Sequence, residues 1–377
     1  MEKSITKQSI LVVLIITFIL INTYSTALAS TTEPTLTVNK KTIYVGKKYN
    51  IVSMIKNVDK SASLTYKSLD KSLAKVSSKG NLSGICVGKT KVVVEVVQNN
   101  KKYTLKLEVI VKEKATPATA FDYSINYKNN MVIDGLADSL NKNIVIPTKI
   151  DNKKVKEIGS RAFSNFKSLE SIYIPETVTS IGFMAFGGCT SLKILVIPNS
   201  VNNLDSFALA STTSLEKVTL SKNITSISDF LFMSASNLKN IVIPSKVTTI
   251  GSGAFQFCTS LKDIEIPDNV TEIDKFAFSY CSSLTSVKLS KNLTAISEGA
   301  FTGCTELKKV DIPKSVNRIS SNAFANNENL EYITIPSSVV AIGIGAFEGC
   351  DNLTIITPAK SYAEKYAIEH NIPYINQ

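Results

Sequence analysis

The chain repeats one 23-residue pattern nine times, and this period restricts its fold more than any other feature. Each copy carries a Leu-x-x-Ile-x-Ile segment and, further on, an Ala-Phe pair. A unit this short has no core of its own and can bury its apolar residues only against the next unit. The period therefore predicts a solenoid. The second residue of the pair recurs as Phe163, Phe186, Leu209, Phe232, Phe255, Phe278, Phe301, Phe324 and Phe347.

The Leu-x-x-Ile-x-Ile segment alternates apolar and polar residues, which predicts one short β-strand per copy with one face inward. Proline follows it in six copies and ends the strand, because proline cannot donate to a ladder. Ser221 and Ser290 take its place in two others. We expect no copy to have gained or lost a residue, so Ile356 should occupy the inward position that Ile333 fills one copy earlier.

The Leu-x-x-Ile-x-Ile-Pro, Val-x-x-Ile-Gly and Ala-Phe-x-x-Cys elements of residues 120–377 resemble the BspA-like leucine-rich repeats of bacterial surface proteins. The resemblance implies a mainly β solenoid with short strands and short helical turns. It also implies a role in binding proteins, such as host proteins or other bacterial surfaces. We assign residues 159–359 to the repeats and 121–158 to an N-terminal cap.

Residues 360–377 are expected to form a C-terminal cap helix and tail. Ser361 and Glu364 have the spacing of a capping box at the start of a helix. The predicted apolar face of this helix consists of Tyr362, Ala363, Tyr366 and Ala367.

Residues 1–29 have the pattern of a secretory signal peptide. Lysines precede an apolar run from Ile10 to Ile21, and the small-x-small site Ala27-Leu28-Ala29 follows it. The run is short for a membrane span. We therefore expect a secreted, extracellular or cell-surface-associated protein with no membrane span after cleavage.

Between residues 30 and 112 the apolar period changes to two, which predicts a β-sandwich. The segments Tyr66-Lys67-Ser68-Leu69-Asp70, Leu82-Ser83-Gly84 and Gly88-Lys89-Thr90 resemble a group 2 bacterial immunoglobulin-like domain. Tyr66 stands where that family often has Trp. The resemblance implies a stalk or binding module, which residues 113–120 would link to the solenoid. The fold class is therefore mainly β with two domains.

Positive charge is concentrated before the solenoid. The formal net charge of the chain is +11, and residues 30–116 alone hold 17 lysines against six acidic residues. Such a surface can attract anionic polymers such as those of the cell wall, but a lysine-rich surface that is merely solvated is the simpler explanation. Clustered aromatic residues that would indicate nucleic acid are missing.

Nothing in the residue pattern indicates catalysis, a cofactor or a metal site. His370 is the only histidine and lies in the expected cap helix, away from any nucleophile. Five of the six cysteines share one repeat position with Phe, Thr, Ala and Asn, which indicates packing. A disulfide within Cys258, Cys281 and Cys304 stays open as an alternative. The five are Cys189, Cys258, Cys281, Cys304 and Cys350.

The strand side chains that point away from the core should form a sheet face on which a protein partner binds. Apolar residues gather at its N-terminal end, and aromatic residues dominate binding hot spots. We therefore expect a non-enzymatic, adhesin-like binding protein. The alternative is a structural envelope component tethered to anionic cell wall through the lysine-rich domain. The candidate binding residues are Tyr173, Ile194, Val196, Val242 and Tyr332.

Overall fold

The computed structural model divides the chain into two compact units, residues 1–113 and 114–377. The predicted signal peptide and Cys86 lie outside the described residues. The described residues are 33–44, 48–71, 73–84, 88–112, 116–137 and 142–377.

The first unit consists of two small sheets around one core. A four-stranded sheet has the order β2-β9-β8-β5, a three-stranded sheet has the order β3-β7-β6, and β1 pairs with β4. Buried side chains of both sheets, such as Ile43, Leu82 and Val94, belong to one apolar cluster. Membership of the immunoglobulin-like family stays a prediction. The elements are β1 (Thr35–Leu36), β2 (Lys40–Tyr44), β3 (Lys48–Asn50), η1 (Val52–Met54), β4 (Ile55–Lys56), β5 (Ser63–Ser68), β6 (Ala74–Val76), β7 (Asn81–Gly84), β8 (Gly88–Gln98) and β9 (Lys101–Lys112).

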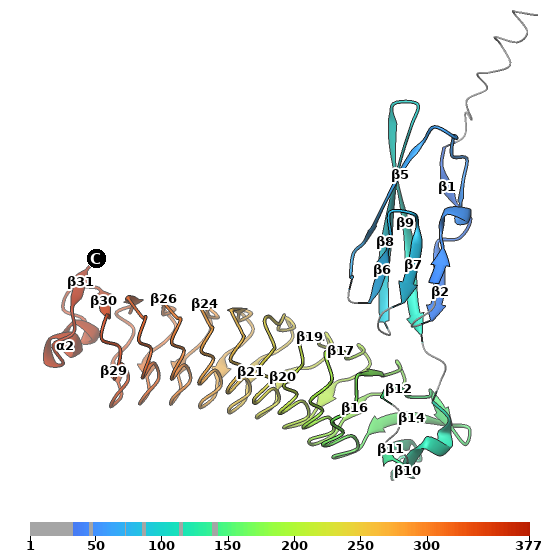
Figure 1. Cartoon of the computed structure of the whole chain (residues 1–377). Coiled ribbons are helices and arrows are strands. Elements are labelled where there is room, and N and C mark those ends of the chain that lie inside the picture. Colours follow the sequence, from blue (N-terminus) through green and yellow to red (C-terminus); the bar gives the residue numbers. More distant parts are fainter. Residues whose placement is uncertain (1–32, 45–47, 72, 85–87, 113–115, 138–141) are drawn as a thin grey trace, which may run out of the picture. The chain divides into compact units, whose positions relative to one another are not determined.

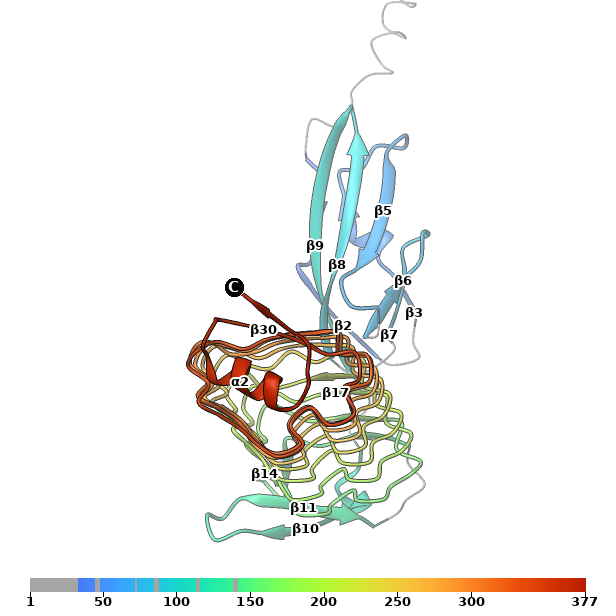
Figure 2. The ribbon, with the colours of Figure 1, turned by 90° about the vertical axis from the view of Figure 1, so that its left-hand side faces the viewer.

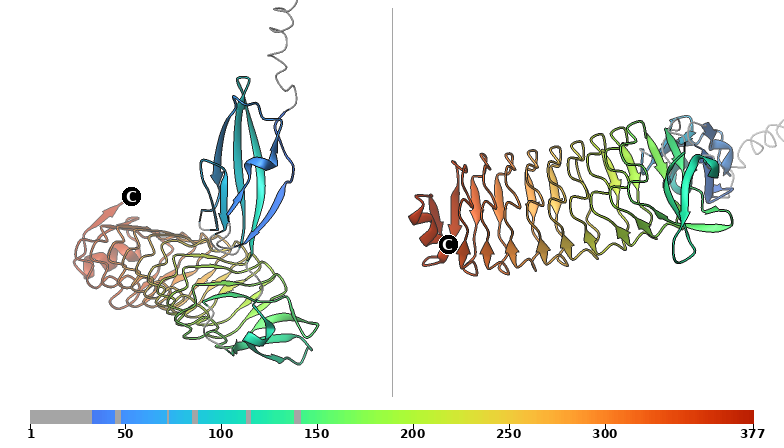
Figure 3. Two further views of the ribbon diagram at one scale, coloured as in Figure 1. Left: turned by 45° about the vertical axis from the view of Figure 1, so that its right-hand side comes forward. Right: turned by 90° about the horizontal axis from the view of Figure 1, so that it is seen from below.

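The second unit is a solenoid whose coils stack in one row (Figures 1 and 3). Most repeats contribute a three-residue strand to one row of strands, and these begin at β15 (Ser171–Tyr173). The later members of this row are β17 (Ile194–Val196), β19 (Lys217–Thr219), β22 (Asp263–Glu265), β24 (Ser286–Lys288), β26 (Lys309–Asp311), β28 (Tyr332–Thr334) and β30 (Thr354–Thr357).

A second row of parallel two-residue strands lies on another side of the coils. Neighbouring strands pair at an offset of one repeat, as Thr249 does with Glu272, so the predicted solenoid and its period are confirmed. Seen along the row, successive coils superpose (Figure 2). The second row is β16 (Ser180–Ile181), β18 (Asn203–Leu204), β20 (Ser226–Ile227), β21 (Thr249–Ile250), β23 (Glu272–Ile273), β25 (Ala295–Ile296), β27 (Arg318–Ile319) and β29 (Ala341–Ile342).

The interior of the solenoid is a ladder of phenylalanine rings. Phe255 and Phe278 stack 5.1 Å apart at 5°, and Phe278 and Phe301 stack 5.3 Å apart at 5°. Leu209 is fully buried in the coil that lacks the ring. Each ring therefore fills the centre of its coil and covers its neighbours, as the repeat pattern predicted.

The expected short helical turns are instead a series of hydrogen-bonded turns. In every repeat, the residues two before and two after the central Phe or Leu position have a positive φ. Residues in this left-handed region interrupt a right-handed helix. The turns are joined between coils by backbone bonds such as Phe255 N–H to the Ala277 carbonyl, 2.8 Å.

The last repeat differs from the expectation that no copy has lost a residue. Ile333 pairs with Ile355, not with Ile356 as predicted, so the strand comes one residue early. Ile355 is fully buried, whereas Ile356 is only half-buried. The spacing from the repeat leucine, Leu353, to the inward residue is thus two positions here instead of three.

Strands and one helix close both ends of the solenoid. At the N-terminal end, the hairpin of β10 and β11 extends the second row, because β11 pairs with β14 and β14 with β16. The N-terminal elements are η2 (Ala118–Ala120), β10 (Phe121–Ile125), β11 (Met131–Leu136), β12 (Asn143–Val145), β13 (Lys149–Ile150) and β14 (Lys153–Ile158).

The C-terminal end has the predicted helix, α2 (Tyr362–Glu369), in which Ser361 Oγ accepts the Glu364 N–H at 3.1 Å. Tyr366 is buried with the two alanines, but Tyr362 is exposed and does not belong to the apolar face as predicted. The tail was not expected to be regular. It forms β31 (Tyr374–Asn376), which continues the first row beside β30.

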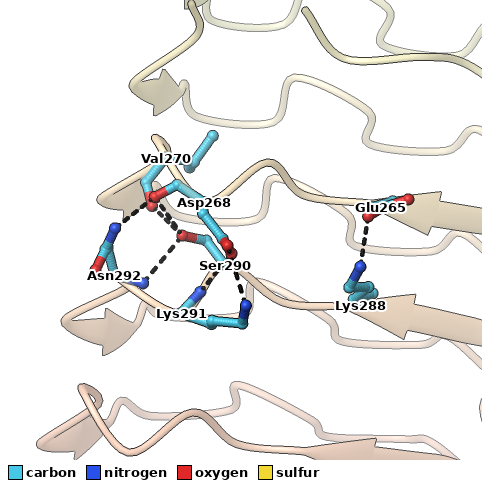
Figure 4. A network of polar contacts seen from close by, with 7 residues as sticks. All are labelled: Glu265, Asp268, Val270, Lys288, Ser290, Lys291 and Asn292. Atoms are coloured by element: carbon cyan, nitrogen blue, oxygen red, sulfur yellow. Dashed lines mark hydrogen bonds and ion pairs between the residues drawn. The ribbon is translucent and has the colours of Figure 1, made fainter. Parts of the chain in front are cut away.

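Serine replaces the strand-ending proline through its hydroxyl group. Ser290 Oγ donates to the Val270 carbonyl at 2.6 Å and accepts the Asn292 N–H at 3.1 Å (Figure 4). Asn292 Nδ2 donates to the Asp268 carbonyl at 2.7 Å. The hydroxyl thus ties the turn to the previous coil, where proline acts by restricting the backbone.

Candidate functional site

The sheet face is the surface formed by the outward side chains of the first strand row. At its N-terminal end Tyr173, Ile194 and Val196 are half-buried, so they offer only part of their area. Val242 is 84% exposed, but Thr219 lies in the coil between it and Val196. Burial, followed by the nearby Glu176 carboxylate, raises the pKa of Tyr173.

The structure separates Tyr332 from the other four predicted binding residues. Tyr332 begins β28, beside Lys309 of β26 and several coils beyond Val242. Its surroundings are polar: Asp311 accepts from Thr334 Oγ1 at 2.8 Å and pairs with Lys309 Nζ at 3.3 Å. The five residues therefore do not form one patch.

Charged groups on the later half of the sheet face are engaged by polar or oppositely charged side chains of the neighbouring coil. Glu265 bonds to Lys288, and Asp263 Oδ1 accepts from Ser286 Oγ at 2.8 Å (Figure 4 shows the first pair). Exposed pairs of this kind contribute at most about 1 kcal/mol to stability. This half of the face is a balanced polar surface.

A second surface carries more exposed aromatic area than the sheet face. We call it the aromatic turn face, because its residues lie in the turns around the Ala-Phe pairs. Phe207 and Phe230 stack 4.7 Å apart, and Phe257 and Tyr280 stack 5.0 Å apart. Three of its rings are about 40% exposed. The aromatic turn face consists of Phe183, Phe207, Phe230, Phe257, Phe276 and Tyr280.

Five of these six aromatic residues occupy left-handed backbone. Phe276 has a φ of +58° and Tyr280 a φ of +59°. An L-residue pays about 1–2 kcal/mol for this conformation, and other coils avoid the cost with glycine, such as Gly299 and Gly303. The rings are thus placed where the backbone favours glycine. Strain of this kind often coincides with functional sites.

Sequence reasoning missed the aromatic turn face because it followed the buried positions and the outward strand positions of the repeat, and not the residues of the turns. The signal was present two residues on either side of the central Phe or Leu. Phe207, Phe230 and Phe276 stand two residues before it, where four of the other six copies have glycine or asparagine. Comparing the copies position by position for unusually bulky residues would have found it.

The five cysteines that share one repeat position are buried and unreactive. Each described thiol donates to the carbonyl of the central Phe one coil earlier, as Cys281 Sγ does to Phe255 at 3.2 Å. All five are free. Burial raises the pKa of Cys258 and of Cys304 to about 12, so these thiols stay protonated and are poor nucleophiles.

His370 lies at the end of α2, where its ring stacks on Tyr366 at 4.0 Å and Nδ1 is 2.9 Å from the Tyr366 carbonyl. Within the described part of the chain, no three His, Cys, Asp or Glu residues gather in a way that could hold a metal ion. In the same part, no helix has the length and apolarity needed to cross a bilayer.

Comparison with known families identifies the solenoid. The profile of the BspA type leucine rich repeat region matches residues 156–284 and 271–371, with six copies, and so spans more than half of the chain. The chain belongs to this family. Its members are bacterial surface repeat proteins, generally without enzymatic activity, and the family suggests a protein-binding role at the cell surface.

Solved structures of bacterial repeat proteins are similar to this chain. A leucine rich cell surface protein from Faecalibacterium prausnitzii is 25% identical, with a TM-score of 0.33, over 68% of this chain and 98% of its own. The Treponema pallidum leucine rich repeat protein is 24% identical, with a TM-score of 0.38, over 70% and 98%. The pneumococcal vaccine antigen PcpA is 19% identical, with a TM-score of 0.41, over 72% and 86%. No curated protein matches the chain.

Proposed function

We propose that this protein is a secreted, non-enzymatic adhesin-like protein whose solenoid binds a protein partner on a host matrix or on another bacterial surface. The observation that carries the proposal is the aromatic turn face. Phe257, Phe276 and Tyr280 expose large rings at fixed positions, and such residues supply most of the energy at protein interfaces. At the same positions of other coils, glycines such as Gly299 and Gly303 adopt the positive φ without this steric cost.

The predicted sheet-face residues form a second, weaker candidate for the same function. Val242 and Tyr332 are the exposed members of that set, and they lie apart. An apolar strand residue also has a simple explanation, since β-branched residues suit strands. We therefore rank the aromatic turn face first.

The two surfaces can be tested with substitutions taken from other copies of the same repeat position. The turn-face variant carries Phe257→Ser, Phe276→Asn and Tyr280→Ser, because Ser234 and Asn322 hold those positions elsewhere with a positive φ. The sheet-face variant carries Val242→Thr and Tyr332→Ser, as in Thr219 and Ser286.

Both variants and the unchanged protein are measured for binding to purified matrix proteins and to intact cells of other bacteria. We expect the turn-face variant to lose binding at least about tenfold, since three exposed aromatic residues are removed. Loss in the sheet-face variant alone would assign the function to the sheet face instead. Equal binding by all three proteins would refute both surfaces.

A second function is favoured by the lysine-rich first unit, namely a tether to the anionic polymers of the bacterial envelope. The test is binding of the full chain to purified cell wall across a salt series. A charge-based tether is released by salt, because added ions screen the lysines. Retention at high salt, or no binding at all, would contradict it.

A further inference from the structure

One face of the four-stranded sheet in the first unit is strongly basic. Alternate residues of a strand point to opposite faces, and Val92, Val94 and Val96 of β8 are fully buried. Lys89 and Lys91 of β8 therefore lie on the outer face. Val93 of β8 pairs with Lys67 of β5 on one side and with Lys106 of β9 on the other, so these two lysines lie on the same face.

The carboxylates of this face are already engaged. Among β2, β5, β8 and β9 the only acidic residues are Glu95 and Glu108. Glu95 pairs with Lys102 at 2.9 Å, and Glu108 pairs with Lys40 at 3.7 Å. The hydrogen bond from Lys102 is the main reason why the pKa of Glu95 is lowered. The four lysines named above therefore exceed the carboxylates that these strands offer to balance them.

A cleft of about 940 Å³ runs along β5, the edge strand of the same sheet. Lys67, Lys71 and Lys75 line it, together with Thr65, Ser68 and Glu95. The cleft therefore combines three lysines and two hydroxyl-bearing residues with one carboxylate, Glu95, which already pairs with Lys102.

We propose that this cleft and the adjoining basic face bind a linear phosphodiester polymer. The inference rests on the tether function proposed above and names its ligand class and its site. Lys67, Lys71 and Lys75 would hold consecutive phosphates, and Thr65 and Ser68 would contact the hydroxyl groups of the linking units.

The chemistry of the site favours such a polymer over other anions. Its basic residues are all lysines, which meet a phosphate as point charges from many directions and so suit a flexible chain. A planar carboxylate is better matched by arginine. Nucleic acid binding would need a series of stacking rings, and among the described strands of this face only Tyr44 points an aromatic ring outward.

The test measures binding of the full chain to immobilised poly(glycerol phosphate), with dextran sulfate as the competing polyanion and purified cell wall as the reference. The cleft variant carries Lys67→Gln, Lys71→Gln and Lys75→Gln. The matched control carries Lys56→Gln, Lys60→Gln and Lys79→Gln, which removes the same charge outside the cleft and away from the outer face. Circular dichroism confirms that each variant is folded.

We expect the cleft variant to bind poly(glycerol phosphate) at least about tenfold more weakly, and the control to stay within about twofold. Equal loss in both variants would show that the cleft is not the binding site, although the proposed tether function would still stand. Binding of the unchanged protein to wall and dextran sulfate but not to poly(glycerol phosphate) would overturn the ligand class. Failure to bind wall at all would refute the tether and this inference together.

Discussion

The ring of Phe230 lies over Gly253 in the next coil, so closely that a β-carbon at Gly253 would come within 2.4 Å of Phe230 Cε1. Phe276 and Gly299 repeat the relationship at the same distance. In both cases glycine makes room for an aromatic residue of the preceding coil. The aromatic turn face thus depends on small residues in one coil and bulky residues in its neighbour.

Substituting Gly253→Ala should destabilise the solenoid by about 1–3 kcal/mol, because the side chain meets the Phe230 ring and the φ of +57° disfavours it. Urea unfolding monitored by circular dichroism measures the change. Gly187→Ala is the control, since its β-carbon would make only ordinary contacts and Ala210 holds the same repeat position. If Phe230→Ala added to Gly253→Ala restores none of the loss, the ring contact is not its cause.

Phe276→Asn should leave the free energy of unfolding within about 1 kcal/mol of the unchanged protein, or raise it. Asparagine tolerates left-handed backbone, as Asn322 does at the equivalent position, and this gain offsets the lost ring packing. Unfolding in urea gives the comparison. A loss of more than about 2 kcal/mol would mean that the ring is there for stability and not for binding.

Asn327→Cys should stabilise the protein by about 1–3 kcal/mol. Asn327 occupies the cysteine position and is fully buried, and its amide nitrogen and oxygen have no hydrogen-bond partner in the structure. A thiol there could donate to a carbonyl as the other cysteines do. Thr212→Cys is the control, because Thr212 Oγ1 already donates to the Leu209 carbonyl at 2.7 Å. A gain equal to that of the control would refute the explanation.

The buried cysteines should make a constant contribution to the free energy of unfolding below about pH 9. This contribution should fall as the pH rises from about 9 to about 12. Burial raises the pKa of Cys258 and Cys304 from 9.0 to about 12, so the folded chain holds these protons after the unfolded chain has released them. Urea unfolding between pH 8 and 11 tests this. The same series on Cys258→Ala with Cys304→Ala should show a smaller slope, and an unchanged slope would contradict the assignment.

Much of the fold followed from the sequence because a strict period determines both the strand register and the buried positions. The buried column from Phe163 to Phe347 and the six strand-ending prolines were predicted in this way, whereas the C-terminal cap helix was predicted from the capping box of Ser361 and Glu364. The period failed at Ile356, where one residue is missing between Leu353 and the inward position. It also failed for the tail, since β31 belongs to no repeat.

The candidate binding surfaces were harder to predict because outward residues are not constrained by packing. The alternation of apolar and polar residues correctly placed Val242 and Tyr332 on the surface. It could not show how much area Tyr173 exposes, or whether the outward apolar residues form one continuous patch. The aromatic turn face depends on backbone φ values at Phe230, Phe257 and Phe276, which hydrophobic periodicity does not report.

We propose above all that the aromatic turn face binds a protein. Its most direct test is the dissociation constant of the full chain for the best partner among the matrix proteins and cell surfaces, before and after the change Phe257→Ser, Phe276→Asn and Tyr280→Ser. We predict a complex that is at least about tenfold weaker, with unchanged thermal unfolding of the variant. An unchanged dissociation constant in a folded variant would contradict it.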